Sequence, residues 1–322
     1  MSATELRRLT DGFRASQVVH AAATLGLADL IGDGSPTSDE LAAATGTDSR
    51  ALYRLLRALA SLGVFHEEPG RRFRLTDLGG SLRSDAPDSV AGWAVLIGRP
   101  YYRDAWTHLV ESVRTGENAF RLAYGLSVWD YRTQHPEEGA IFDAAMVSSS
   151  RLVIDSLLEA YDFGRFETIV DVGGGSGALL AALLAEYQEL RGVLFDQPHV
   201  VEDLDLGPRC EIVGGSFFEA VPGGGDAYLL KWIIHDWEDD ESRAILRTVR
   251  RTGGTVLVIE RLLGPPNEDP AVKLSDINML VATGGRERTL EEFASLFDAA
   301  DYRLVGWTAT ATGTHVIEGA PR

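Results

Sequence analysis

A run of glycines between an apolar strand and an apolar helix constrains this chain more than any other feature. Residues 168–172 (TIVDV) have the largely apolar character of a buried strand, residues 173–177 (GGGSG) follow directly, and residues 178–184 (ALLAALL) are typical of a helix packed on a sheet. Glycine suits a position where the chain turns sharply and a ligand approaches the backbone. The first N–H groups of the helix behind the turn can bind an electronegative ligand group. This order of elements predicts an α/β domain that binds a nucleoside cofactor.

A second strand supports a nucleoside ligand but leaves its identity open. Residues 192–195 form a short apolar segment that ends at Asp196, about 20 residues beyond the glycines. A carboxylate at this strand end can accept hydrogen bonds from both hydroxyls of a ribose. However, Gly173, Gly175 and Ala178 also satisfy the dinucleotide-binding fingerprint G-x-G-x-x-G/A. NAD and S-adenosylmethionine both fit this pattern.

The first 30 residues predict a long helix. Leu6, Leu9 and Phe13 recur at helical spacing, and residues 15–28 contain no charged side chain. Because so little of this segment is polar, we expect the helix to bury more than one face, with a second subunit as one partner for it.

The next segment predicts a winged helix. Thr37 and Glu40 form a T-x-x-E capping box for a short helix that Gly46 ends. The elements that follow are a second helix between Asp48 and Gly63, and two strands at 64–66 and 72–75 around the turn at Pro69 and Gly70. Two helices followed by a hairpin are the outline of a winged helix.

Arginines on this predicted winged helix raise the alternative of a DNA-binding regulator. Arg50, Arg54 and Arg57 share one helix face, and the hairpin carries three more arginines. Residues 1–90 nevertheless hold 10 Arg against 12 Asp and Glu, a net charge of −2, whereas a DNA-binding domain is usually basic. We therefore favour a role in dimerisation or in covering a substrate.

The overall composition narrows the class of protein further. The net charge of −18 opposes a nucleic-acid role for the whole chain, because phosphate binding needs an excess of Lys and Arg. The one cysteine, Cys210, excludes an internal disulfide and a cysteine-based zinc cluster. No stretch free of charged residues exceeds 14 residues, which is too short for a membrane-spanning helix, and charges interrupt any signal peptide. We expect a soluble, cytoplasmic protein with no membrane partner.

The remaining segments complete the predicted architecture. Residues 88–165 are expected to be helical except for an irregular, aromatic-rich segment at 116–131, whose rings could pack or line a ligand pocket. Farther on we expect a strand at 227–234, a helix that begins with a capping box of Thr289 and Glu292, and strands near 303–309 and 314–318.

The downstream motifs resemble those of one enzyme family. Residues 213–218 (VGGSFF) and 226–237 (DAYLLKWIIHDW) are similar to segments of the small-molecule O-methyltransferases that use S-adenosylmethionine. Residues 258–260 (VIE) and 284–289 (GGRERT) resemble two further blocks of that family. The resemblance implies a winged-helix dimerisation domain at 1–95, and a Rossmann-like class I methyltransferase domain at 96–322 with a helical substrate-pocket segment at about 96–165.

The resemblance also implies which residues bind S-adenosylmethionine. Gly173, with Gly175 beside it, would contact the methionine part, and Asp196 the ribose. Further contacts would come from Ser216 and Phe217 beside the adenine and from Lys231 on the next strand. Ser216 departs from the family pattern, which more often has aspartate at this position, so the adenine loses a charged partner.

The chemistry of methyl transfer directs attention to His235. A phenol with a pKa near 10 is ionised to only about one part in a thousand at pH 7, so a general base raises its reactivity. His235 follows a strand of the predicted sheet, and histidine can take this proton near neutral pH. By the resemblance, Glu260 and Glu287 frame the histidine, whereas Asp236 is expected to cap the helix after Trp237. We expect no metal, because His235, Asp236 and the distant His199 do not have a ligand spacing.

These features together predict an O-methyltransferase for a phenolic hydroxyl of a small molecule in secondary metabolism, acting as a homodimer. By resemblance, the walls of the substrate site would come from Trp129, Met146, Asp276 and Met279. The alternatives are N-methylation or another reaction on the same fold, an NAD-dependent oxidoreductase, and the DNA-binding regulator.

Overall fold

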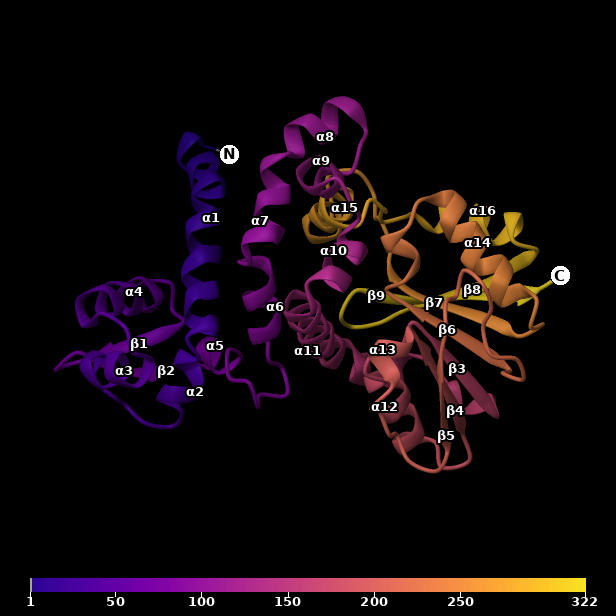
Figure 1. Ribbon diagram of the computed structural model, residues 1–322, viewed down its shortest axis with the longest axis horizontal. Coiled ribbons are helices and arrows are strands. Elements are labelled where there is room, and N and C mark those ends of the chain that lie inside the picture. Colours follow the sequence, from indigo (N-terminus) through magenta and orange to yellow (C-terminus); the bar gives the residue numbers. More distant parts are fainter. Residues whose placement is uncertain (1) are drawn as a thin grey trace. The chain divides into compact units, whose positions relative to one another are not determined.

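The computed structural model describes residues 2–322 as two compact units (Figure 1). Of the described residues, the first unit comprises 2–103 and 135–152, and the second comprises 104–134 and 153–322. Helix α11 (Pro136–Ala160) contributes to both. Among the described residues, no helix has the length and apolar character to cross a membrane.

The first unit contains the predicted winged helix. Its elements are α1 (Ala3–Thr24), α2 (Leu27–Ile31), α3 (Ser38–Thr45), α4 (Ser49–Ser61), β1 (Phe65–Glu68), β2 (Arg72–Leu75), α5 (Asp77–Gly80), α6 (Ala91–Ile97) and the start of α7 (Pro100–Thr107). The capping box of Thr37 and Glu40 and the Asp48 cap are both present, as the sequence predicts. Strands β1 and β2 pair antiparallel, and Phe65 and Phe73 are buried between them and the helices.

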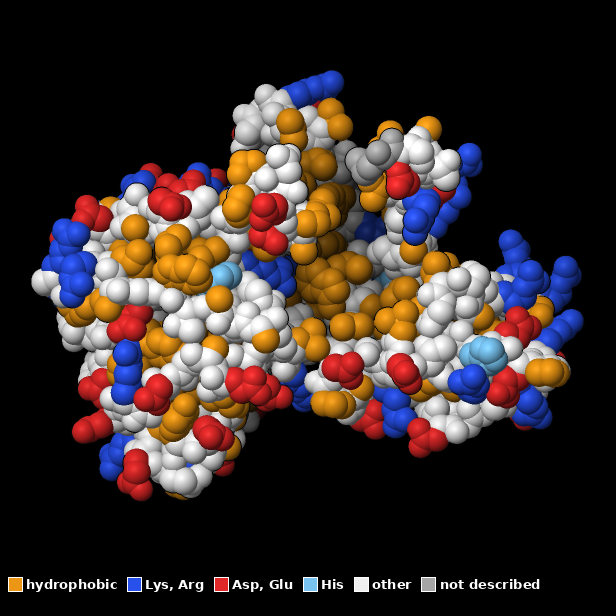
Figure 2. All heavy atoms as spheres, turned by 180° about the vertical axis from the view of Figure 1, so that it is seen from behind, with side chains coloured by type: hydrophobic (Ala, Val, Ile, Leu, Met, Phe, Trp, Pro, Cys, Tyr) orange, Lys and Arg blue, Asp and Glu red, His pale blue; other side chains and the backbone are white. Residues whose placement is uncertain are grey.

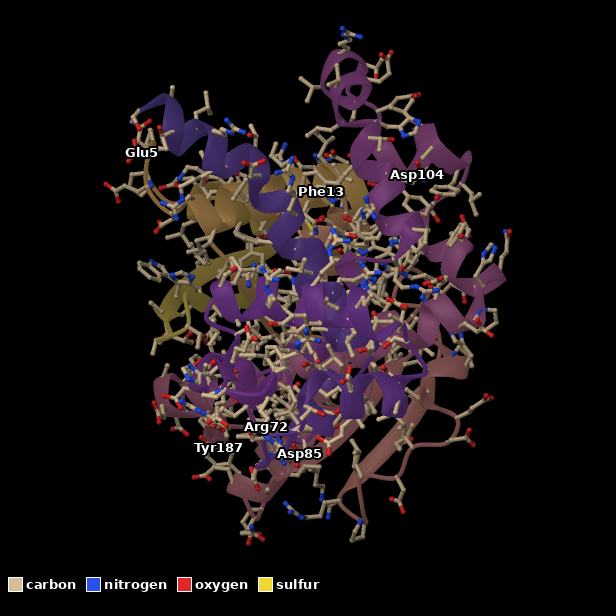
Figure 3. All side chains as sticks on the ribbon, turned by 90° about the vertical axis from the view of Figure 1, so that its left-hand side faces the viewer. Glu5, Phe13, Arg72, Asp85, Asp104 and Tyr187 are labelled. Atoms are coloured by element: carbon tan, nitrogen blue, oxygen red, sulfur yellow. The ribbon has the colours of Figure 1, made fainter. Side chains whose placement is uncertain are left out.

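Within the described chain, helix α1 leaves its predicted apolar positions exposed, so its burial against a second subunit stays a prediction. Leu6, Leu9 and Phe13 are 61%, 68% and 57% exposed, and only Ala22 is buried. Phe13 lies along this helix in Figure 3, and Figure 2 shows hydrophobic side chains on the surface of the molecule. The guanidinium of Arg103 lies 4.9 Å from the ring of Phe13. The apolar spacing therefore marks a face that the chain itself leaves open.

The aromatic-rich segment at 116–131 is helical, not irregular as expected. It contains Gly116, which is the C-cap of α8 (Leu109–Thr115), all of α9 (Ala119–Tyr124) and the start of α10 (Val128–Gln134). Asn118 accepts a hydrogen bond from the backbone N–H of Arg121, and Gly125 ends α9 in a left-handed conformation. The glycines that suggested an irregular segment act instead as the ends of short helices.

A seven-stranded sheet organises the second unit (Figure 1). Its strand order is β5-β4-β3-β6-β7-β9-β8. The first five strands in this order are parallel to one another, and β9 is antiparallel to both of its neighbours, β7 and β8. The strands are β3 (Thr168–Val172), β4 (Arg191–Asp196), β5 (Cys210–Gly214), β6 (Ala227–Lys231), β7 (Thr255–Arg261), β8 (Tyr302–Ala309) and β9 (Thr314–Pro321). A short 3₁₀ turn, η1 (Phe163–Arg165), precedes the first strand of this sheet along the chain. The helices between its strands are α12 (Ala178–Glu186), α13 (Pro198–Val201), α14 (Asp239–Arg250), α15 (Pro270–Ala282) and α16 (Leu290–Ala299). This mainly parallel α/β sheet has the Rossmann-like arrangement that the sequence predicts, with one apolar cluster on each face.

Strand β6 is shorter than predicted, and the difference positions the site. The strand ends at Lys231, because Trp232 adopts a left-handed conformation (φ 56°) that breaks the extended backbone. A short 3₁₀ turn η2 (Ile234–Asp236) follows and carries His235. Ile233 and Ile234 pack on the core beyond the end of the strand. Because both are apolar, the sequence wrongly predicts that the strand continues through them.

Candidate active site

The glycine turn after β3 holds its backbone open toward the end of β4. Gly173 and Gly175 have φ values of 72° and 58°, which glycine adopts without strain. A side-chain carbon on Gly173 would lie 2.4 Å from Cδ1 of Ile233, whereas one on Gly175 would meet no atom within 4 Å. The open space at Gly175 suits a ligand that approaches the backbone closely.

Asp196 ties the glycine turn to the end of β4. Its Oδ2 accepts the backbone N–H of Gly175 at 2.8 Å, and Oδ1 accepts that of Gln197 at 2.6 Å. Burial raises the pKa of this carboxyl, although both N–H donors act in the opposite direction. Asp196 thus fixes the glycine turn to the end of β4.

Asp171 on β3, which is buried, and Lys231 at the end of the neighbouring strand β6 lie below the turn. Burial raises the pKa of Asp171 to about 7, although the positive charge of Lys231 opposes the rise. Burial also lowers the pKa of Lys231 to about 8, and its Nζ lies 4.0 Å from the ring centre of Trp232. Lys231 is therefore not a surface lysine.

An aromatic cluster extends from the glycine turn along the site. Phe217 lies near Gly173, and its ring meets that of Trp237 edge-on with centres 6.1 Å apart. Trp237 stacks on Trp129 of α10, again with ring centres 6.1 Å apart. Ser216 precedes Phe217, and its hydroxyl accepts the N–H of Phe218 at 3.3 Å. These rings supply flat apolar walls of the kind that bind aromatic ligands.

His235 lies between the two glutamates that the sequence selected. Its Nδ1 is 3.3 Å from Oε2 of Glu260 and 3.3 Å from Oε1 of Glu287. Both glutamates are buried, and the backbone N–H of His235 also donates to Oε1 of Glu260 at 3.2 Å. Burial lowers the pKa of His235, but Glu260, Asp236 and Glu287 together outweigh this and raise the pKa to about 10.

The pKa values of Glu260 and Glu287 shift in opposite directions. Burial raises the pKa of Glu260 to about 7, against the attraction of His235. The pKa of Glu287 is lowered instead, because hydrogen bonds from His235 and Ser275 outweigh its burial. The ligand atoms of His235, Glu260 and Glu287 lie within 4.8 Å of one another, a spacing that a metal ion could also use. The expectation that this site works without a metal stays a prediction.

Asp236 does not cap the following helix, so that prediction is wrong. Glu238 occupies the N-cap position of α14. Asp236 instead turns inward, with Oδ1 3.8 Å from Nε2 of His235. Burial raises its pKa to about 6, while the charges of His235 and Arg132 act against the rise. The 3₁₀ turn therefore places both ring nitrogens of His235 near carboxylates. A strand that runs to Ile234, as the sequence predicts, does not imply this arrangement.

A buried arginine fixes the backbone of this segment. The side chain of Arg288 is fully buried and donates to the carbonyl oxygens of Ile234 at 3.0 Å and Trp237 at 2.8 Å. It also forms an ion pair with Asp239 at 2.9 Å. Neither Arg288 nor Ser275, which donates to Glu287 at 2.7 Å, was among the residues selected from the sequence. Arg288 lies within the motif at residues 284–289, so the resemblance could have drawn attention to it. Ser275 is a single serine on α15, and no pattern in the sequence marks it as functional.

The predicted substrate-wall residues fall in different places. Trp129 joins the aromatic cluster, and Met279 and Asp276 lie on α15, where Asp276 accepts the backbone N–H of Glu287 at 2.9 Å. Met146 lies on the part of α11 that belongs to the first unit, so its role stays a prediction.

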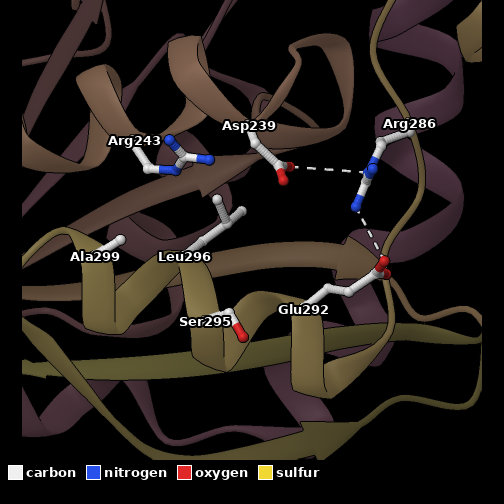
Figure 4. Close-up of a pocket in the computed structure, with 7 residues that line it drawn as sticks. All are labelled: Asp239, Arg243, Arg286, Glu292, Ser295, Leu296 and Ala299. Carbon is white, nitrogen blue, oxygen red and sulfur yellow. Dashed lines mark hydrogen bonds and ion pairs between the residues drawn. The ribbon is translucent and has the colours of Figure 1, made fainter.

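A surface pocket between α14 and α16 lies apart from these residues. It has a volume of about 260 Å³ and is lined by Asp239, Arg243, Arg286, Glu292, Ser295, Leu296 and Ala299 (Figure 4). Arg286 pairs there with Glu292 at 3.0 Å and with Asp239 at 3.8 Å. None of the predicted site residues lines this pocket.

Gly285 allows the His235 segment to pack closely, and we expect Gly285→Ala to disrupt it. An added side-chain carbon would lie 2.2 Å from the carbonyl oxygen of His235 and 2.4 Å from the backbone nitrogen of Trp237. Because backbone atoms cannot rotate away, the substitution should lower the free energy of unfolding by at least about 2 kcal/mol. Gly306→Ala is the matched control, since nothing lies within 4 Å of its added carbon. Equal urea midpoints for the two variants would contradict this packing.

Comparisons with known proteins agree with this geometry. Residues 106–303 match the O-methyltransferase domain, and residues 7–85 match the O-methyltransferase dimerisation domain. A phenazine O-methyltransferase of Lysobacter antibioticus is 41% identical over 98% of this chain and 95% of its own length. An 8-amino-8-demethylriboflavin N,N-dimethyltransferase of Streptomyces davaonensis is 37% identical over 90% of this chain and 87% of its own.

A solved structure identifies the cofactor class. An O-methyltransferase from neocarzinostatin biosynthesis, crystallised with S-adenosylhomocysteine and 1,4-dihydroxy-2-naphthoic acid, matches with a TM-score of 0.81 and 32% identity, covering 100% of both chains. The cofactor of this fold is thus S-adenosylmethionine and not NAD. The chain therefore belongs to the O-methyltransferase family with an N-terminal dimerisation domain, and is an S-adenosylmethionine-dependent O-methyltransferase of secondary-metabolite pathways.

Proposed function

We propose that the protein methylates a phenolic hydroxyl of a small aromatic molecule and that His235 is the general base. The observation that carries this proposal is the position of Nδ1 between the carboxylates of Glu260 and Glu287, at 3.3 Å from each. An imidazole whose Nδ1–H is held in this way has Nε2 free to accept the proton of the hydroxyl. The carboxylates also stabilise the imidazolium that forms.

The residues around the glycine turn fit the cofactor. S-adenosylmethionine, when bound, supplies the electrophilic methyl group. The open backbone at Gly175, with Gly173 beside it, would hold its methionine part, and Asp196 would hold its ribose. Ser216 and Phe217 would bind the adenine, and Lys231 would support the site from β6. Because methyl transfer is a direct displacement, these residues act by fixing the line from the acceptor oxygen through the methyl carbon to the sulfur.

The acceptor is proposed to be flat and aromatic. Trp129 and Trp237 offer stacked rings beside the site, and 1,4-dihydroxy-2-naphthoic acid is bound by the related neocarzinostatin enzyme. Asp276 and Met279 of α15 would complete the walls, and the substrate role of Met146 stays a prediction. The dimerisation domain supports a homodimer, which would cover the exposed apolar face of α1. We retain the expected division at residues 95 and 96, a cytoplasmic location and the absence of nucleic-acid and membrane partners as predictions.

The rate should rise with pH through the neutral range. The pKa of His235 is raised to about 10, so the imidazole is mostly protonated at pH 7 and its base form increases tenfold for each pH unit. We expect log(kcat/KM) for a phenolic acceptor to increase with a slope near 1 between about pH 7 and 9. Initial rates in a constant-ionic-strength buffer series measure this. A profile that is flat above pH 7 would show that the glutamates do not raise this pKa.

N-methylation is the second candidate function, because the related riboflavin enzyme is an N,N-dimethyltransferase. The nitrogen lone pair of a neutral aromatic amine can attack the methyl group before any proton is lost, so an amine needs a general base less than a phenol does. Product analysis with an acceptor that carries both groups separates the two reactions. A methyl group found on nitrogen, formed equally well when His235 is replaced, would favour the second candidate.

A further inference from the structure

Ser275 of α15 holds the glutamate that faces His235. Its hydroxyl donates to Oε1 of Glu287 at 2.7 Å, and this same oxygen lies 3.3 Å from Nδ1 of His235. The neighbouring Asp276 accepts the backbone N–H of Glu287 at 2.9 Å. Two consecutive residues of one helix therefore fix Glu287 at its backbone and at its carboxylate.

Glu260 lacks a comparable partner. Among the described residues, its Oε1 accepts the backbone N–H of His235, whereas its buried Oε2 has no hydrogen-bond partner and only faces Nδ1. A carboxylate that accepts a hydroxyl hydrogen bond keeps its negative charge more readily than one without such a donor. Glu287 is accordingly the charged member of the pair, in agreement with the opposite directions of the two pKa shifts.

Arg261 strengthens the donor character of Ser275. Nη1 of Arg261, at the end of β7, lies 3.5 Å from Oγ of Ser275. An N–H directed at the hydroxyl oxygen leaves the hydroxyl hydrogen to point at Glu287, so the dipoles of Arg261, Ser275 and Glu287 align toward His235.

We propose that Ser275 is a positioning residue for methyl transfer: it fixes Glu287 as the acceptor of the Nδ1–H of His235 and so leaves Nε2 unprotonated toward the acceptor hydroxyl. This inference rests on the proposed role of His235 as base. The acceptor oxygen forms its bond to the methyl carbon while the S–C bond breaks with its electron pair moving to sulfur. The hydroxyl proton moves to Nε2, and Glu287 balances the resulting charge. Without the Ser275 hydroxyl, the proton on the neutral ring can shift to Nε2, and that tautomer cannot accept a proton from the hydroxyl.

The test is nitrogen-15 NMR of the imidazole rings in the full-length protein saturated with S-adenosylhomocysteine. The samples are the wild type, Ser275→Ala, Ser275→Thr and Ser295→Ala, with His235→Asn used to assign the His235 signals. Ser295 is the matched control, because its hydroxyl donates to a helix carbonyl, that of Glu291 at 2.9 Å, in the pocket of Figure 4. The NMR titration needs no acceptor molecule.

We expect Ser275→Ala to lower the pKa of His235 by about 1 and to populate the Nε2–H tautomer, because one hydrogen bond to a charged group is lost. Ser275→Thr should restore both properties, and Ser295→Ala should leave them unchanged. With a phenolic acceptor, kcat of Ser275→Ala at alkaline pH should fall about tenfold while KM for S-adenosylmethionine stays constant. If Ser275→Ala does not fold, Ser275→Cys, whose thiol is a weaker donor, should show the same shift.

An unchanged pKa and tautomer of His235 in folded Ser275→Ala would overturn the role of Ser275, whatever happens to the rate. That outcome leaves the base role of His235 intact. Failure of the base role has a different signature, namely full activity of the His235→Asn protein.

Discussion

Replacing His235 by alanine should reduce methylation of a phenolic acceptor by about 10²–10⁴-fold, the range expected for loss of a general base. The affinity for S-adenosylhomocysteine should stay within about twofold of the wild type, because the glycine turn, Asp196 and the aromatic cluster do not depend on the imidazole. A methyl-transfer assay and calorimetric titration of the same samples measure the two quantities.

The control for this substitution is His66→Ala, which removes an exposed histidine of β1 in the first unit. It should leave rate and affinity unchanged. Equal losses of rate and cofactor affinity in His235→Ala would mean that the histidine supports the fold of the site and is not a base. The urea midpoint of each variant identifies a general loss of stability.

Asp196→Ala should have the opposite pattern. The substitution removes the carboxylate that accepts the N–H of Gly175 at 2.8 Å and that we propose binds the ribose hydroxyls. Loss of hydrogen bonds to a charged group predicts about 100-fold weaker binding of S-adenosylmethionine. At saturating cofactor, kcat should fall by much less, because the acceptor and His235 keep their positions.

Asp205→Ala serves as the matched control, since this exposed aspartate caps only the N–H of Gly207. Calorimetry should show unchanged affinity for it. If Asp196→Ala binds S-adenosylmethionine as tightly as the wild type does, the ribose is not held at the end of β4, and the cofactor orientation must be revised.

Local chemistry was predictable from the sequence wherever a few adjacent residues determine the structure. The capping boxes at Thr37 and Thr289 lie where they were expected, and so does the glycine turn after β3. The meeting of His235, Glu260 and Glu287 could also be anticipated, because the resemblance named all three. These features depend on short-range hydrogen bonds or on recognised motifs.

Features that depend on packing between distant segments were not predictable. The left-handed conformation of Trp232 ends β6 early, although the composition around it is that of a strand. The same turn sends Asp236 toward Nε2 of His235 instead of to a helix cap. Ser275 is one polar residue on a helix, and only the fold shows that it reaches Glu287.

The most direct measurement is to incubate the protein with S-adenosylmethionine carrying a labelled methyl group and an aromatic acceptor that bears both a phenolic hydroxyl and an amino group, then locate the label by mass spectrometry and NMR. The same incubation is run with His235→Ala. We predict that the label appears on the phenolic oxygen with the wild type and is lost with the variant. Label on the nitrogen, or undiminished label on oxygen with His235→Ala, would contradict His235-dependent methylation of a phenol.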